Sequence, residues 1–231
     1  MSRLDAILFD MDGTLMDSEP CWLRADLAMI TAFGGFMTEE EHDACIGMGA
    51  VTFLPYVQKK YGITASFDEM KEFQEKTYLE IARAELKPFP EMVRFAQWAR
   101  ETGIPIAIAS GSTNVIIEEM TALTGIQELF PVRVSSHEVA EGKPAPDVFI
   151  EAAARLAVKP ENCLVLEDSP VGVFASWQAG MHTVAVPPPV VQDPKGYLNK
   201  ADLLIEEGMA GFTADKMITW LKEYFSDSDF S

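Results

Sequence analysis

The sequence predicts a doubly wound α/β fold with a mostly parallel sheet and an inserted domain made only of helices. Two observations predict the sheet: short apolar runs alternate with longer helical patterns, and several of these runs end abruptly in polar residues. A third observation predicts the insert, because residues 17–87 contain helical patterns but no convincing strand.

The expected strands are apolar along nearly their whole length, which indicates strands that helices cover on both faces of a parallel sheet. They occupy residues 6–9, 104–109, 132–134, 163–166, 182–186 and 202–205. Helical patterns lie between and after them, near residues 90–101, 113–123, 146–157, 170–179 and 213–225. Gly103 and Gly180 stand where two of these helices would end.

The stretch from residue 17 to residue 87 interrupts this alternation. A parallel sheet needs its second strand, and that strand does not arrive until about residue 104. We therefore expect an α/β core domain formed by residues 1–16 and 88–231, and a helical domain formed by residues 17–87. The helices expected in this second domain lie near residues 19–33, 38–44, 50–61 and 67–85.

Composition and charge restrict the possible partners. The chain has 231 residues, of which 48% are hydrophobic, and a formal net charge of −18. Such an acidic surface repels nucleic acid and anionic membranes, so we expect neither as a partner. The odd number of cysteines and an N-terminus that reads as a strand, not a signal peptide, predict free thiols in the cytoplasm.

Polar clusters follow several expected strands. Because ligands bind outside the carboxyl ends of strands in an open parallel sheet, these clusters should meet at one edge. A lysine, Lys143, stands just before a helix and between two of the clusters. The clusters are Asp10-Met-Asp12-Gly13-Thr14, Ser110-Gly111-Ser112 and Glu167-Asp168-Ser169.

The acidic members of these clusters suit phosphoryl chemistry. Asp10, Glu167 and Asp168 offer the hard oxygen ligands that Mg²⁺ prefers. Asp10 and Asp12 share a face if the chain stays extended, so one can attack phosphorus while the other exchanges protons. Lys143 supplies a fixed positive charge for phosphate oxygens.

Each motif alone also has an ordinary structural interpretation. Asp12-Gly13 is a common turn signal, Ser110 can cap a helix, and Glu167-Asp168 can be an acidic helix start. The histidines show no metal-ligand spacing, and we expect His42 and His137 in loops or on the surface. The joint appearance of the acidic, serine and lysine motifs at strand ends favours a shared site.

The motifs closely resemble those of the haloacid dehalogenase superfamily of hydrolases. The resemblance covers nearly all of residues 5–190, in order and spacing, and the helical insert corresponds to the mobile cap of that superfamily. The matching segments are DMDGTLMDSE, IASGS, GKPAPDVF and LEDSPVGVFASWQAGM.

The resemblance implies a role for each residue of the motifs. Asp10 would be the nucleophile and a Mg²⁺ ligand, and Asp12 the general acid and base with its carbonyl on the metal. Ser110 and Lys143 would hold the transferring phosphoryl group, and Glu167 and Asp168 would complete the metal site. The residues expected to contact substrate are Gly13, Thr14, Gly111, Asn114, Trp22 and Met48.

Within the superfamily, the chain looks most like the branch of β-phosphoglucomutases and small sugar-phosphate phosphatases. Asp12 disfavours dehalogenation, since halocarboxylic acid dehalogenases lack this second aspartate. Phosphoglucomutases carry a histidine where this chain has Trp22 and a cap arginine where it has Ala50. We therefore expect a phosphatase acting on a small phosphorylated metabolite of the sugar-phosphate class, with a mutase as the nearest alternative. From the architecture we expect a monomer.

Two interpretations from other classes also use residues of this kind. A phospho-acceptor signalling domain uses acidic residues, a hydroxyl and a lysine at strand ends, but without the D-x-D-G-T form or a helical insert. A non-catalytic metabolite-binding protein would not need an intact nucleophile and base. Catalytic turnover separates the phosphatase from both.

Overall fold

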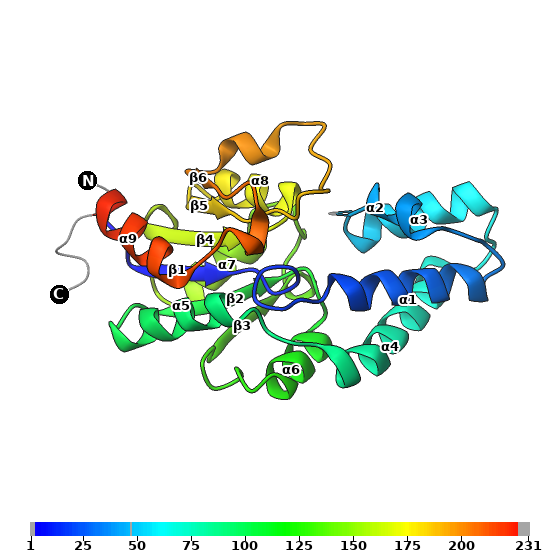
Figure 1. The fold of residues 1–231 in the computed structure, drawn as a ribbon, viewed down its shortest axis with the longest axis horizontal. Helices are drawn as coiled ribbons and strands as arrows, with labels where there is room; N and C mark the ends of the chain where they lie inside the picture. The colour runs from blue at the N-terminus through cyan, green and yellow to red at the C-terminus, as the bar shows by residue number, and fades with distance from the viewer. Residues whose placement is uncertain (1–2, 47, 226–231) are drawn as a thin grey trace.

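The computed structural model describes residues 3–46 and 48–225, and its centre is a six-stranded sheet in the order β3-β2-β1-β4-β5-β6 (Figure 1). Every strand pair is parallel, which confirms the predicted doubly wound sheet. The strands are β1 (Ala6–Phe9), β2 (Ile106–Ser110), β3 (Val132–Ser135), β4 (Cys163–Glu167), β5 (His182–Ala185) and β6 (Leu203–Leu204).

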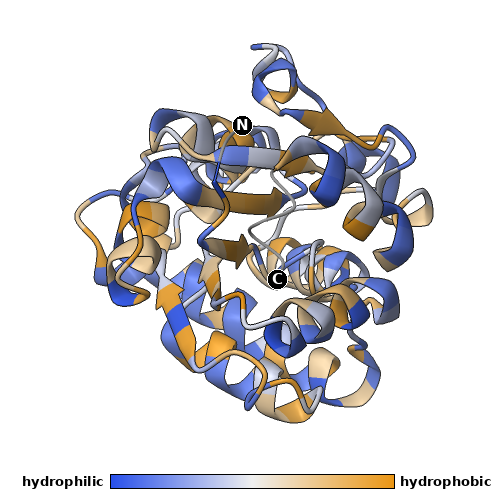
Figure 2. Ribbon diagram, turned by 90° about the vertical axis from the view of Figure 1, so that its left-hand side faces the viewer, coloured by the Kyte–Doolittle hydropathy of each residue, from blue (hydrophilic) through white to orange (hydrophobic). Residues whose placement is uncertain are grey.

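Helices cover both faces of the sheet because successive residues of a strand point to opposite sides. In β1, Ile7 and Phe9 belong to one hydrophobic cluster and Ala6 and Leu8 to the other. The helices that follow the sheet strands or precede β2 are α5 (Pro90–Glu101), α6 (Asn114–Leu123), α7 (Asp147–Arg155), α8 (Pro170–Gln178) and α9 (Ala214–Tyr224). Figure 2 shows the apolar strands enclosed by helices with hydrophilic outer faces.

Short 3₁₀ helices complete the sheet domain. They are η1 (Ser136–Glu138), η2 (Pro160–Asn162), η3 (Tyr197–Lys200) and η4 (Gly208–Ala210). The last strand, β6, is shorter than the expected residues 202–205, although the backbone N–H groups of Asp202 and Ile205 still donate to the carbonyls of Thr183 and Ala185 at 2.8 Å and 2.9 Å.

The expected helices of the insert are present as α1 (Glu19–Ala32), α2 (Glu39–Asp43), α3 (Ala50–Tyr61) and α4 (Phe67–Glu85). They lie to one side of the sheet domain in Figure 1. Capping boxes fix where two of them begin: Thr38 with Glu41 starts α2, and Ser66 with Glu69 starts α4. The insert has its own cluster of buried apolar residues, including Met29, Phe53 and Met70.

The two chain segments that enter and leave the insert lie side by side. The backbone N–H of Asp17 donates to the carbonyl of Lys87 at 3.0 Å, and Met16 forms an isolated bridge with Pro88. These contacts fall at the expected domain boundaries. We keep the division into a core of residues 1–16 and 88–231 and a cap of residues 17–87 as a prediction.

The expectation that His42 lies on the surface or in a loop is wrong. His42 is on α2 and only 5% exposed, and its Nε2 lies 2.7 Å from Asp26 Oδ2. Gln74 donates to the other oxygen of the same carboxylate. Asp26 is itself buried inside the insert, and a buried charge requires partners, which holds His42 inward against α1.

Candidate active site

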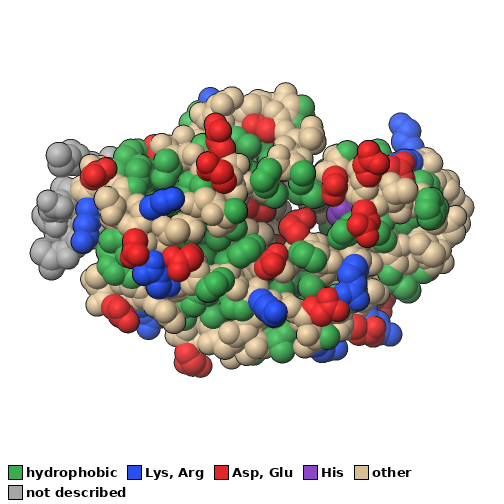
Figure 3. All heavy atoms as spheres, in the orientation of Figure 1, with side chains coloured by type: hydrophobic (Ala, Val, Ile, Leu, Met, Phe, Trp, Pro, Cys, Tyr) green, Lys and Arg blue, Asp and Glu red, His purple; other side chains and the backbone are tan. Residues whose placement is uncertain are grey.

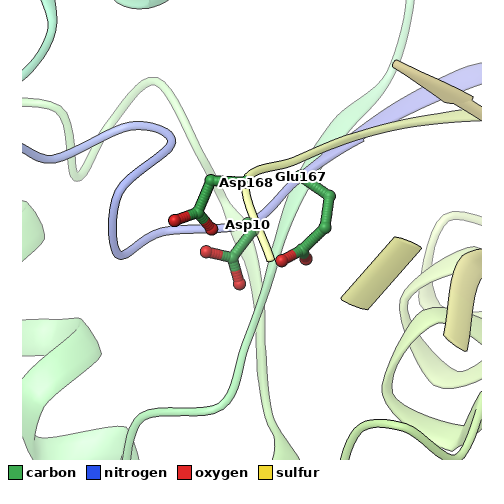
Figure 4. A group of neighbouring side chains, drawn as sticks. All are labelled: Asp10, Glu167 and Asp168. Atoms are coloured by element: carbon green, nitrogen blue, oxygen red, sulfur yellow. The ribbon is translucent and has the colours of Figure 1, made fainter. Parts of the chain in front are cut away.

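Strand register brings the acidic residues together at the carboxyl end of the sheet. Phe9 of β1 is paired with Leu166 of β4, and the N–H of Asp10 donates to the Leu166 carbonyl at 2.9 Å. Asp10 therefore emerges beside Glu167, which ends β4, and beside the next residue, Asp168. All three side chains are buried, and one oxygen from each lies within 4.8 Å of the others (Figure 4).

Lys143 is the cationic partner of this acidic group. Its Nζ donates to Asp10 Oδ1 at 2.5 Å and to Glu167 Oε2 at 2.7 Å. Burial acts to lower the pKa of Lys143, but attraction to the two carboxylates outweighs burial and raises it above its ordinary value. Lys143 therefore stays protonated, with its ammonium 4.8 Å from the centre of the Phe149 ring.

One lysine does not balance three buried carboxylates. Burial, together with the charge of Glu167, raises the pKa of Asp10 and of Asp168 well above the ordinary aspartate value, although Lys143 acts to lower both. When all three carboxylates are ionised, two negative charges remain uncompensated. A divalent cation would supply that compensation, so the donor set fits a hard metal ion with oxygen ligands.

Two glycines permit the close approach of these carboxylates to the backbone. Gly13 has a φ of +74°, and a Cβ added there would lie 2.2 Å from Asp168 Oδ2. A Cβ on Gly172 would lie 2.0 Å from the carboxylate carbon of Glu167. Ser169 fixes the same carboxylate, because its hydroxyl and backbone N–H donate to Glu167 Oε1 at 2.6 Å and 3.1 Å.

Asp12 is half-buried and is held by donors from distant parts of the chain. Ser112 donates through its hydroxyl to Asp12 Oδ2 at 2.7 Å, and Trp22 donates through its indole to Oδ1 at 2.9 Å. Tyr78 of α4 stacks on Trp22 and places its hydroxyl 3.5 Å from the same Oδ1. Asp12 thus touches both the loop after β2 and the helices of the insert.

The remaining predicted substrate contacts show no hydrogen bond to the acidic group within the described residues. Thr14 is fully buried, and its Oγ1 has no hydrogen-bond partner among the described residues. Gly111 and Asn114 are exposed in the turn after β2 and at the start of α6. Met48, 41% exposed on the segment between α2 and α3, shows no hydrogen bond or ring contact to the acidic group within the described ranges.

The hydroxyl of Ser110, a predicted phosphoryl contact, faces inward. It accepts the N–H of Ser112 at 3.0 Å and is completely buried at the end of β2. In this arrangement Ser110 orders the turn that carries Ser112. Its role as a direct phosphoryl contact stays a prediction.

Several functional neighbours were not predicted from the sequence. Ser112 belongs to the motif that singled out Ser110, so its position was signalled although its contact with Asp12 was not. Gly172 belongs to the fourth matching motif, but its contact with Glu167 was not signalled, and Tyr78 carried no local signal. Glu19 ends the first matching motif, but its environment was not predicted: burial and the charge of Asp12 raise its pKa from 4.5 to about 7.

Comparison with known proteins agrees with this geometry. The profile of the haloacid dehalogenase-like hydrolases matches residues 7–186. The chain belongs to this family.

Two relatives of this haloacid dehalogenase-like hydrolase are named phosphatases. Hexitol phosphatase B of Escherichia coli O157:H7 is 32% identical over 208 residues, covering 86% of this chain and 90% of the relative. The phosphorylated carbohydrates phosphatase of Thermotoga maritima is 28% identical over 181 residues, covering 78% and 84%. The predicted enzyme class, a phosphatase of this superfamily, is therefore confirmed.

A solved structure extends the similarity to three dimensions. CbbY from Rhodobacter sphaeroides, in complex with xylulose-(1,5)bisphosphate, is 25% identical with a TM-score of 0.77. The match covers 90% of this chain and 95% of that chain. No helix in the described part of this haloacid dehalogenase-like hydrolase is long and apolar enough to cross a membrane.

Proposed function

We propose that this protein is a Mg²⁺-dependent phosphatase that hydrolyses the phosphate monoester of a small sugar or sugar alcohol. The ester is cleaved through an aspartyl-phosphate on Asp10. The observation that carries the proposal is the convergence of Asp10, Glu167 and Asp168 within 4.8 Å of one another, with Lys143 bonded to two of them.

Asp10 is suited to the role of nucleophile by its position and its partner. It is the first residue after β1, at the edge of the sheet where ligands bind in this fold. Lys143 neutralises part of the charge that Asp10 shares with Glu167, and the same ammonium can hold a phosphate oxygen during transfer. The bond that forms joins an Asp10 carboxylate oxygen to phosphorus, while the ester bond to the leaving oxygen breaks.

Asp12 is suited to proton exchange because it is close to Asp10 but is not part of the buried carboxylate group. It gives a proton to the leaving oxygen in the first step. In the second step it takes a proton from the water that attacks the aspartyl-phosphate, which restores Asp10 and releases inorganic phosphate.

A metal ion would be held by Asp10, Glu167 and Asp168, with the backbone carbonyl of Asp12 as a further ligand. Bound there, Mg²⁺ supplies positive charge that orients phosphate oxygens and stabilises the negative charge of phosphoryl transfer. The fit rests on the surplus negative charge of the three buried carboxylates and on the raised pKa values of Asp10 and Asp168.

The class of substrate is inferred from the relatives and from the charge of the cleft. Figure 3 shows an indentation between the sheet domain and helices α1 to α4, with acidic side chains along both sides. Glu19, near Asp12 and Asp168, adds negative charge beside the site. A second phosphate on the substrate would be repelled there, whereas the hydroxyls of a sugar or polyol would find acceptors.

The same charge distribution favours a phosphatase over a mutase. A mutase must hold a phosphate at each end of its substrate, and Ala50 offers no charge at the position where the mutases carry an arginine. The Trp22 indole N–H already donates to Asp12. A mutase would yield an isomerised sugar phosphate when primed with a bisphosphate, and we expect inorganic phosphate instead.

The test is phosphate release from a panel of hexose, pentose and polyol monophosphates, with Mg²⁺ or with EDTA. We expect release of phosphate from members of the panel with Mg²⁺ and no release with EDTA. Asp10→Asn should abolish turnover while retaining the fold by circular dichroism, and Asp43→Asn, on the exposed end of α2, should behave as wild type. Near-normal hydrolysis by Asp10→Asn would disprove the assignment of the nucleophile.

A further inference from the structure

Both carboxylate oxygens of Asp12 accept a hydrogen bond, and the nearest donor to each oxygen differs in what it can do chemically. The Tyr78 hydroxyl is a more distant third partner, 3.5 Å from Oδ1. On Oδ2 the partner is the hydroxyl of Ser112, at 2.7 Å. On Oδ1 it is the indole N–H of Trp22, at 2.9 Å. A serine hydroxyl can donate or accept, whereas an indole nitrogen can only donate.

Ser112 is locked in place by its neighbours in the sheet domain. Its backbone N–H donates to the hydroxyl of Ser110 at 3.0 Å, and its carbonyl accepts the hydroxyl of Ser135 at 2.6 Å. Ser110 and Ser135 end the adjacent strands β2 and β3 and are completely buried. The Ser112 hydroxyl therefore reaches Asp12 from a residue whose backbone N–H and carbonyl are both hydrogen-bonded.

Trp22 is held with similar rigidity by the insert. Its ring stacks on Tyr78, with the ring centroids 3.8 Å apart and the planes 12° from parallel. Tyr78 is completely buried between α1 and the sheet domain. Because the two rings fix each other, the indole N–H is aimed at Asp12 Oδ1 independently of any substrate.

A carboxyl proton that points along the lone pair facing a donor-only group would place two hydrogens against each other. A proton on Asp12 Oδ1 would compete with the Trp22 N–H for that oxygen and would weaken their hydrogen bond. A proton on Oδ2 keeps both bonds, because the Ser112 hydroxyl can turn and become the acceptor. The contacts of Asp12 thus distinguish its two oxygens.

We propose that Trp22 and Ser112 are positioning residues for Asp12, and that Trp22 reserves Oδ2 as the oxygen that exchanges protons with the substrate. The inference rests on the proposed function, in which Asp12 is the acid and base. In the first step the Oδ2–H bond breaks and the leaving oxygen takes the proton. The leaving oxygen keeps the electron pair of the broken bond to phosphorus, and the carboxylate that remains accepts from Trp22 and Ser112.

The test compares two esters that differ in their need for a proton. A polyol phosphate releases an alkoxide-like oxygen that must be protonated, whereas p-nitrophenyl phosphate releases a stabilised anion that needs none. Release of the alcohol or phenol is followed in single turnovers with excess enzyme and Mg²⁺, so that later hydrolysis of the aspartyl-phosphate does not limit the signal. The variants are Trp22→Phe, which keeps the ring stack, and Ser112→Ala.

We expect each variant to slow release from the polyol phosphate by about 10- to 100-fold and release of p-nitrophenol by less than about 3-fold. Ser112→Thr, which retains the hydroxyl, should restore most of the polyol rate. Trp177→Phe, on the exposed face of α8, is the matched indole control and should change neither rate.

Equal slowing of both esters would overturn the proposal, because it would mean that the variants disturb the nucleophile or the fold. A higher KM with an unchanged chemical rate would also overturn it, because Trp22 would then be a substrate contact. The proposed function fails separately, if wild-type protein forms no phosphoenzyme from either ester.

Discussion

The carboxylate of Asp168 lies directly over the α-carbon of Gly13, so close that a Cβ on Gly13 would be 2.2 Å from Oδ2. The backbone at Gly13 also has a φ of +74°, which is unfavourable for any residue with a side chain. Gly13 is therefore required both by the turn after β1 and by the space that the Asp168 side chain occupies.

Gly13→Ala should lower activity by more than about 100-fold, because Asp168 must move out of the acidic group. It should also lower the free energy of unfolding by about 1–3 kcal/mol, measured by urea denaturation. Gly103→Ala is the matched control: its φ is +81°, but nothing lies within 4 Å of the added Cβ. It should lose stability and keep activity, and an active Gly13→Ala would contradict the assigned clash.

Lys143→Met should leave Asp10 and Glu167 without their cationic partner in a buried site. We expect the free energy of unfolding in EDTA to fall by about 3 kcal/mol at pH 8, and by less at pH 5, where the carboxylates can take up protons. Mg²⁺ should restore part of the stability but not the activity. Lys159→Met replaces an exposed lysine and should change neither stability nor activity. Unchanged stability of Lys143→Met would refute a structural role for the ion pairs of Lys143 with Asp10 and Glu167.

Glu19 should make the stability of the protein depend on pH. Burial, with the charge of Asp12, raises its pKa from 4.5 in an ordinary environment to about 7 in the fold. Between these values the folded state holds a proton that the unfolded state releases, so the contribution of Glu19 to stability falls as pH rises from 4.5 to 7.

Glu19→Gln removes this pH-dependent contribution. The melting temperature of the variant, relative to that of wild type, should therefore rise as the pH rises from 4.5 to 7. We expect a gain of roughly 2–4 °C at pH 8 compared with pH 4.5, measured by calorimetry in EDTA. Glu161→Gln, in an exposed position, serves as the control. A difference between Glu19→Gln and wild type that does not change with pH would show that the carboxyl titrates normally.

His42→Leu should destabilise the insert, because Asp26 would remain buried with Gln74 as its neutral partner. We expect a loss of about 3 kcal/mol in urea denaturation. The double variant Asp26→Leu/His42→Leu should lose less than the single one, since no buried charge is left unpaired. His137→Leu, at an exposed histidine, is the control; a double variant worse than the single would contradict the pairing.

The fold was predictable because its signals are local. Buried parallel strands are continuously apolar, as in Ile106–Ser110 and Cys163–Glu167, and helix ends carry capping residues such as Thr38 and Ser66. The acidic group was predictable for the same reason, because Asp10 and Glu167 each follow or end such a strand.

The remaining features depend on register and on contacts between distant segments. Nothing local indicates that Trp22 and Ser112 both reach Asp12, or that Tyr78 backs the indole. His42 was misplaced because it follows three glutamates on a short helix, a pattern typical of a solvated surface. Only the packing of α2 against α1 reveals the buried partner, Asp26.

The bond between Asp17 and Lys87 and the bridge between Met16 and Pro88 bring both ends of the helical insert to a single point. The segment from α1 to α4 is therefore one long insertion between β1 and β2 whose two ends lie side by side. Such an insertion can be replaced, lengthened or shortened in evolution while every strand keeps its neighbouring strands in the sheet. The helical insert and the strands of the sheet can therefore change at different rates.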